Sequence, residues 1–144
     1  MKKGFTLVEI MIVVAIIVLL AAIAIPNLLR ARVNANQSAA VAGLHTVSTA
    51  AQSYRGANTS YPVLLASLAS PNETPPYIDD VLGNGTKQGY IFVLAGGTNS
   101  FTATAMPTDW AQTGARNFFV DTSGVIKYND TENQTPVAGD SVLE

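Results

Sequence analysis

The sequence contains no cysteine and a single histidine, and charged residues make up only 12% of it. The absence of cysteine excludes disulfides, thiol catalysis, cysteine-bound metals and a lipid-modified cysteine anchor. The signatures Gly-x-Ser-x-Gly, the Walker loop and His-Glu-x-x-His are also missing. His45 has no catalytic partner and is predicted to lie at the surface or boundary of the fold. We therefore predict no enzyme, no catalytic residue, and no cofactor or metal site.

Negative charge is scarce in the first half of the chain. Every acidic residue except Glu9 lies at Glu73 or later. The basic residues of the first half mostly flank an apolar run, at Lys2, Lys3, Arg30 and Arg32. The rest of the chain is acidic, which argues against a nucleic-acid partner bound through a basic face. Its acids fit no calcium-loop spacing and are interpreted as solvated loop residues.

One long apolar run dominates the N-terminus. Phe5 to Ile25 contains 21 residues and one charge, that of Glu9. As a helix it would span roughly 31 Å, close to the hydrocarbon thickness of a bilayer. The remainder of the 144 residues has the size of one small domain. The sequence therefore predicts one compact domain on one membrane-crossing helix.

Two simpler interpretations of the run stay open. Lys2 and Lys3, with the small-x-small triplet at residues 22–24, are typical of a secretory signal peptide, whose removal would release a soluble exported binding domain. A plain single-pass anchor would tolerate Glu9 near the membrane interface. Against the signal peptide, the run is long, and an acid at its start has no role in such a segment.

Glu9 requires an explanation, because a charged side chain deep in a membrane costs about 2.5 to 3.5 kcal/mol and usually has a partner. A cut between Gly4 and Phe5 would create a new α-amine at the start of the apolar helix, and this amine would be the nearest cation. It would meet Glu9 on its own helix or, in a staggered bundle of identical helices, the Glu9 of a neighbour. The second geometry would set the register of an assembly, which is the better attested use of a desolvated ion pair.

The stretch Lys2-Lys3-Gly4-Phe5-Thr6-Leu7-Val8-Glu9, its apolar run and Pro26 together resemble the processing and methylation motif of type IV prepilins and of type II secretion pseudopilins. The resemblance implies that a prepilin peptidase and methyltransferase removes leader residues 1–4 by cutting between Gly4 and Phe5, and methylates the Phe5 amine. It also implies that Glu9 neutralises the amine of an adjacent subunit during polymerisation.

The same resemblance implies a structural subunit that polymerises with itself into a type IV pilus, with a type II secretion pseudopilus as the alternative. Before assembly the subunit would span the inner membrane once, with a cytoplasmic N-terminus, and would meet an assembly platform. Afterwards it would lie in an extracellular pilus or a periplasmic pseudopilus. Residues 117–129 are similar to the last hairpin of short bacterial pilins, which favours the pilus. Many type IV pilins close their C-terminal region with a disulfide, and this chain has no cysteine for one.

Residues 26–56 are predicted to form an amphipathic helix that continues from the apolar one (5–25). Pro26 lacks a backbone N–H, so it should kink the helix or begin a new one. Beyond it, apolar residues recur at spacings of 4, 3, 4 and 3, at Ala40, Leu44, Val47, Ala51 and Tyr54. Gly56 is a credible stop signal.

Residues 57–144 are predicted to form a globular head with an antiparallel sheet. After a short helix near Leu65 and a proline-rich loop, the pattern becomes typical of strands, at 90–94, 101–105, 117–120 and 125–128. Gly124 lies in the second hairpin turn and is free to take positive φ. A sheet of three or four strands needs a cover, which the apolar stripe provides. The predicted fold is thus α+β, a long helix packed on a small antiparallel sheet, with a polar, flexible tail after Asn129.

Overall fold

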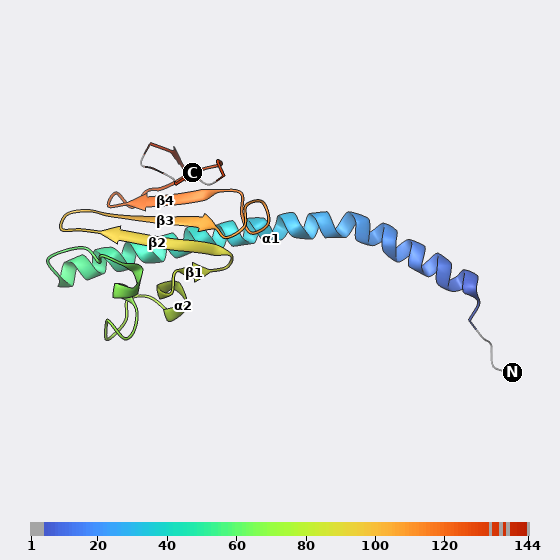
Figure 1. The fold of residues 1–144 in the computed structure, drawn as a ribbon, viewed down its shortest axis with the longest axis horizontal. Helices are drawn as coiled ribbons and strands as arrows, with labels where there is room; N and C mark the ends of the chain where they lie inside the picture. Colours follow the sequence, from blue (N-terminus) through green and yellow to red (C-terminus); the bar gives the residue numbers. More distant parts are fainter. Residues whose placement is uncertain (1–4, 133, 136, 138, 144) are drawn as a thin grey trace. The chain divides into compact units, whose positions relative to one another are not determined.

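The structure, a computed structural model, describes residues 5–132, 134–135, 137 and 139–143. The chain divides into two compact units, Met1–Arg32 and Val33–Glu144. One helix, α1 (Leu7–Ala57), belongs to both of them (Figure 1). The other elements all lie in the second unit, the head: η1 (Leu65–Leu68), α2 (Asp80–Gly83), β1 (Thr86–Lys87), β2 (Tyr90–Gly96), β3 (Phe101–Pro107), β4 (Asn117–Asp121), β5 (Ile126–Asn129) and β6 (Ser141–Val142).

The first unit contains α1 only as far as Arg32, together with the residues before the helix. Helix α1 begins at Leu7 and continues through Pro26, so no second helix starts at the proline. The side-chain amide of Asn27 donates to the carbonyl of Ile23 at 3.1 Å, four residues earlier and one place after the carbonyl that Pro26 leaves without its N–H donor. A kink at Pro26 stays a prediction.

The head contains one six-stranded antiparallel sheet in which each strand pairs with its neighbours in sequence. The four predicted strands are confirmed as β2 to β5, and the predicted short helix is the 3₁₀ turn η1. Strands β1 and β6 were not predicted, because each has only two residues and depends on its partner for its conformation. Helix α1 ends at Ala57, slightly beyond the Gly56 stop signal.

The C-terminal half of α1 covers one face of the sheet (Figure 1), which confirms the predicted α+β arrangement. Four stripe residues of α1 are buried in the core, and Tyr54 is partly buried against it. Gly43 lies beside this stripe and has no side chain. A Cβ added to Gly43 would lie only 2.7 Å from Cζ of Phe92. The aromatic ring of β2 therefore packs directly on the backbone of the helix. From β2 to β5, the core residues of the sheet are Tyr90, Phe92, Leu94, Phe101, Ala103, Ala105, Phe118, Val120 and Ile126.

The turn between β4 and β5 is built as predicted. Gly124 has φ of +74°, a conformation that favours glycine. The Asp121 carboxylate accepts a hydrogen bond from the backbone N–H of Ser123 at 2.8 Å. Hydrogen bonding from the side chain and backbone of Ser123 lowers the pKa of Asp121 below its usual value. The hydrogen bond from Ser123 to the Asp121 carboxylate helps to close the turn.

Candidate assembly and processing site

The residues predicted to direct processing and assembly lie at the start of α1. Phe5 precedes the helix and is 82% exposed, and Glu9 lies in the first helical turn. Gly4, on the other side of the predicted cut, lies outside the described residues. Pro26 lies farther along the same helix, just after the apolar run 5–25. Phe5 and Glu9 therefore lie together at the start of α1, whereas Pro26 lies elsewhere on the helix.

Glu9 is held by Thr6 in a reciprocal capping arrangement. The Glu9 Oε2 atom accepts hydrogen bonds from the Thr6 N–H at 3.1 Å and from the Thr6 hydroxyl at 3.0 Å. In return, the Glu9 N–H donates to Thr6 Oγ1 at 3.2 Å. This capping box satisfies backbone donors that the first turn of a helix otherwise leaves without a partner. In a membrane such donors would have no water to bind, so the Glu9 carboxylate stabilises the first turn of its own helix.

Thr6 is a functional residue that the sequence reasoning missed. The signal was present, because Thr6-Leu7-Val8-Glu9 is the Thr-x-x-Glu pattern of a capping box ahead of an apolar run. The cap uses only one carboxylate oxygen: within the described part of the chain, Glu9 Oε1 accepts no hydrogen bond. One oxygen is therefore committed to the helix, and the other is available to a cation.

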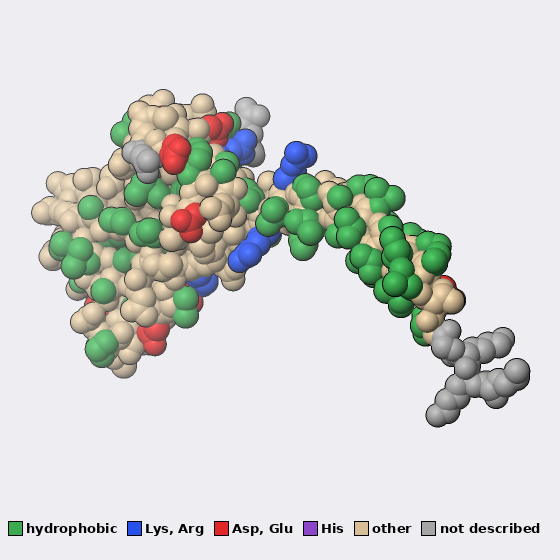
Figure 2. Space-filling view, turned by 45° about the vertical axis from the view of Figure 1, so that its right-hand side comes forward, with side chains coloured by type: hydrophobic (Ala, Val, Ile, Leu, Met, Phe, Trp, Pro, Cys, Tyr) green, Lys and Arg blue, Asp and Glu red, His purple; other side chains and the backbone are tan. Residues whose placement is uncertain are grey.

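The apolar half of α1 has no cover in the described structure. Hydrophobic side chains gather along the helix of the first unit (Figure 2), and the large ones between Phe5 and Leu29 are each 50% to 82% exposed. Helix α1 is long and apolar enough to cross a membrane by length and composition. Exposure of this extent is unfavourable in water, because burying one such side chain contributes about 1.5–3 kcal/mol. This surface needs lipid or other apolar helices around it.

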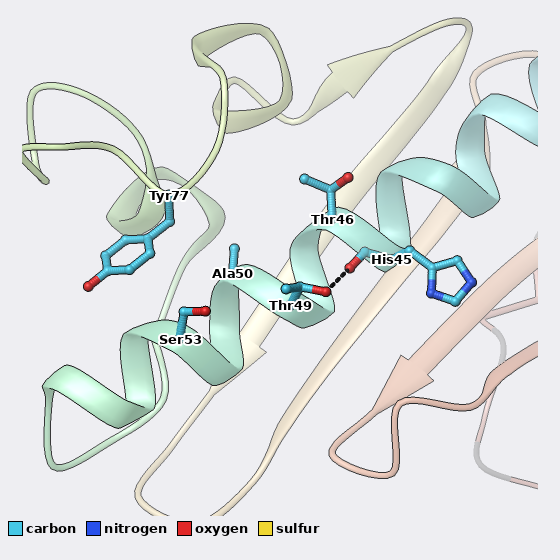
Figure 3. A pocket seen from close by; sticks show the side chains of 6 residues that line it. All are labelled: His45, Thr46, Thr49, Ala50, Ser53 and Tyr77. Carbon is cyan, nitrogen blue, oxygen red and sulfur yellow. Dashed lines mark hydrogen bonds between the residues drawn. The ribbon is translucent and has the colours of Figure 1, made fainter.

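A cavity of about 390 Å³ lies between α1 and the loop before α2, within the head (Figure 3). The hydroxyls of Thr46 and Thr49 donate to carbonyls of their own helix, at 3.0 and 2.9 Å. His45 is exposed, as predicted, and its ring points away from Tyr77 (Figure 3). Both threonine hydroxyls are therefore hydrogen-bonded to backbone carbonyls of α1, and they form no nucleophile–base pair with His45. The residues that line the cavity are His45, Thr46, Thr49, Ala50, Ser53 and Tyr77.

The fold and this site define a class of protein: a subunit with an uncovered apolar helix, capped by an acid at its start and carrying a small α+β head. Comparison with known proteins agrees. Residues 1–25 match the family described as the prokaryotic N-terminal methylation motif. The chain is 39% identical over 106 residues to the type IV wide pilus major component PilA4 of Thermus thermophilus, a match that covers 71% of this chain and 81% of that protein.

Two further relatives match shorter segments. The type II secretion system core protein G of Escherichia coli is 36% identical over 90 residues, 62% of this chain and 61% of that protein. The type IV major pilin protein PilA of Myxococcus xanthus is 51% identical over 53 residues, 37% of this chain and 24% of that protein. The chain belongs to the family of type IV pilins and type II secretion pseudopilins.

Proposed function

We propose that this protein is a structural, non-catalytic subunit that polymerises with itself into a type IV pilus through its N-terminal helix. The observation that carries the proposal is the uncovered apolar half of α1 with Glu9 capped at its start. In the polymer, the apolar halves of identical helices pack together and replace lipid as the cover. The heads, which have their own core, remain outside.

Processing prepares this step. A prepilin peptidase and methyltransferase cuts between Gly4 and Phe5 and methylates the new α-amine. The cut places a cation at the start of the helix, where Phe5 is highly exposed. The amine of one copy then pairs with Glu9 of an adjacent copy. Because Glu9 Oε2 is occupied by Thr6, Oε1 is the oxygen offered to the neighbour. A pair formed only at one axial offset between helices fixes the register of the polymer.

The location of the subunit follows the same sequence of events. Before assembly it is a single-pass protein of the inner membrane with a cytoplasmic N-terminus, and it is extracted by a pilus or secretion assembly platform. After assembly it lies in the filament. The apolar length of α1 supports the membrane stage, since no other described helix is long and apolar enough to cross a bilayer.

A pseudopilus of a type II secretion system is the second candidate. The similarity to the Escherichia coli core protein G supports it, whereas the longer match to a wide-pilus component supports the pilus. Both candidates use the same processing and the same polymer contact. They differ in the length and location of the filament. Deletion of the gene distinguishes them: loss of long surface filaments supports the pilus, and loss of exported proteins with filaments intact contradicts it.

The most direct experiment is mass analysis of the mature N-terminus in the native host. A chain that begins at N-methylated Phe5 supports the proposal. A chain that begins at Ile25, released by an ordinary signal peptidase, would contradict it, because the apolar helix would then be discarded. A chain that retains residues 1–4 would contradict it as well, since no α-amine would form beside Glu9.

A further inference from the structure

The segment after β5 is secured without a covalent link. We call residues 130–143, as far as they are described, the C-terminal strap. Its regular structure is β6, which pairs with β5 through two residues only. Near its end, the N–H of Leu143 donates to the carbonyl of Ile126 at 2.9 Å. The described strap residues are mostly polar, so hydrophobic burial contributes little to holding them. Other contacts must hold the strap in place.

Asn117, the first residue of β4, is the centre of those contacts. It is 2% exposed, and its Nδ2, which carries two hydrogens, lies within hydrogen-bond distance of three oxygens: Asn129 Oδ1 at 3.0 Å, the carbonyl of Thr131 at 2.8 Å and that of Gln134 at 3.1 Å. Because side chains alternate along a strand and Phe118 belongs to the core, Asn117 points to the face away from α1. A buried side-chain amide without acceptors would lower the stability of the fold, so the oxygens that surround Asn117 stabilise the closed strap.

A second set of hydrogen bonds extends the one around Asn117. Asn129 faces Asn117 across β4 and β5, and its Nδ2 donates to Asp140 Oδ2 at 3.0 Å. The same carboxylate oxygen accepts the N–H of Val137 at 2.8 Å. Hydrogen bonds to a carboxylate are stronger than those between neutral groups. The chain of contacts Asn117, Asn129 and Asp140 therefore reaches from β4 to the far end of the strap.

The first part of the strap lies against the outer face of the sheet, the face away from α1. A cleft of about 470 Å³ is lined both by the strap residues Glu132 and Thr135 and by the sheet residues Ile91 and Met106. Phe119 points to this face, since it lies two residues after Asn117, and it is only 6% exposed. The cleft between the strap and the sheet is therefore partly apolar, and it lies on the side of the head that α1 does not cover.

We infer that Asn117 is the latch of a strap that opens as a unit while strands β1 to β5 and the core stay folded. Of the described strap residues, only Leu143 packs against the hydrophobic core. The core itself is formed by α1, by residues 65–82 and by strands β2 to β5. A segment with few buried apolar contacts belongs to the least stable part of a structure, and it can open without global unfolding. This inference concerns the head alone and does not depend on the proposed polymer.

The test is amide hydrogen exchange of the full-length protein in detergent micelles, read by mass spectrometry. Asn117→Asp keeps the shape of the side chain but replaces the donor with a carboxylate, which repels the carbonyls of the strap. We expect exchange at the Val137 and Leu143 amides to become about 10- to 100-fold faster, with exchange in β2 and β3 unchanged. Asn99→Asp is the matched control, because it adds the same charge in the exposed loop between β2 and β3.

Three results would overturn the inference. Equal acceleration in β2, β3 and the strap would show that Asn117 stabilises the whole head rather than latching one segment. Unchanged strap exchange in Asn117→Asp would show that its bonds do not hold the strap. A second variant, Asn117→Leu, removes the donor without adding charge. If the strap opened in the aspartate variant but stayed closed in the leucine variant, charge repulsion would be the cause and the donor would not be the latch.

Discussion

The two units of the chain treat the same kinds of residue in opposite ways. In the first unit Ile16 is 52% exposed, whereas in the head Leu44 is completely buried, although both lie on α1. Around Leu44 the apolar residues form a stripe that the sheet covers. Around Ile16 they surround the helix on all sides, which is typical of a helix that is covered from all directions. One helix thus has a half that completes its own domain and a half whose cover comes from outside.

This difference separates residues that stabilise the folded head from residues expected to act in assembly. Substitutions in the head should change its free energy of unfolding, whereas substitutions in the apolar half should change membrane residence and filament yield. Substitutions in either unit, and the pH dependence of the head, can test this separation.

The largest effect is expected from Glu9→Ala. The variant removes both the capping oxygen and the charge, so filament yield should fall at least about tenfold, while membrane insertion stays intact or improves because a buried charge costs insertion energy. Filaments sheared from cells and membrane-bound subunit are the measurements. Glu9→Gln is the matched control, since glutamine can still cap the helix but carries no charge. Normal filament yield from the alanine variant would show that the pairing argument is wrong.

Leu44→Ala should destabilise the head by about 2–5 kcal/mol, because it leaves a cavity in a fully buried position of the core. Ile16→Ala, a truncation of similar size in the apolar half of α1, should leave the free energy of unfolding of the head nearly unchanged. Denaturant unfolding of the full chain in micelles, followed by circular dichroism, measures both. Equal destabilisation by the two variants would contradict the division of α1 into two roles.

The head should also lose stability at alkaline pH through Tyr90. Burial raises the pKa of this phenol to about 12. The neutral hydroxyl donates to the carbonyl of Arg116 at 3.0 Å. An unfolded tyrosine has a pKa of about 10, so the neutral phenol favours the folded state. Its contribution is complete below about pH 10 and is lost as the pH rises to about 12.

Unfolding free energies measured across this range, with tyrosinate absorbance as a second signal, test that prediction. Tyr90→Phe should flatten the pH dependence, because no phenol remains to ionise at this position. Tyr77→Phe, which keeps Tyr90, should retain it. If the free energy of unfolding of Tyr90→Phe still fell with pH as steeply as that of the wild type, a group other than Tyr90 would cause the loss of stability at alkaline pH.

The smallest effect is expected from Thr6→Val. Valine keeps the shape of threonine but cannot exchange side-chain hydrogen bonds with Glu9, which should weaken the first turn of α1 by about 1 kcal/mol. The Thr6 N–H still reaches Glu9, so filament yield should fall by no more than a few-fold. The ratio of filament to membrane subunit measures the effect. A loss as large as that of Glu9→Ala would mean that the cap rather than the charge directs assembly.

Much of this fold could be read from the sequence, because its main elements carry strong periodic patterns. The stripe from Ala40 to Tyr54 predicted the covered face of α1, and alternation predicted β2 to β5. The short elements α2, β1 and β6 escaped prediction, since two to four residues carry no period. The role of Asn117 could not be predicted either, because its acceptors are backbone carbonyls brought to it by the folded strap.

The candidate site was more accessible to sequence reasoning than the strap. Glu9 stood out as an isolated charge, and the motif around Phe5 is local. What the sequence reasoning lacked was the capping bond to Thr6, whose pattern was present and was passed over. The structure changes the interpretation of Glu9: its carboxylate already has a partner within its own chain, and the second oxygen is the one left for another copy.

The strand order of the sheet has a consequence for the way the head reaches its folded state. Every strand pairs with the one before it in the chain, from β1 to β6. Topologies with such local pairing have low contact order and fold quickly, because little chain entropy is lost in closing each loop. As the chain emerges with α1 first, each strand from β2 onward follows the strand with which it pairs. The strands of the sheet can therefore pair one after another, in the order in which they occur in the chain.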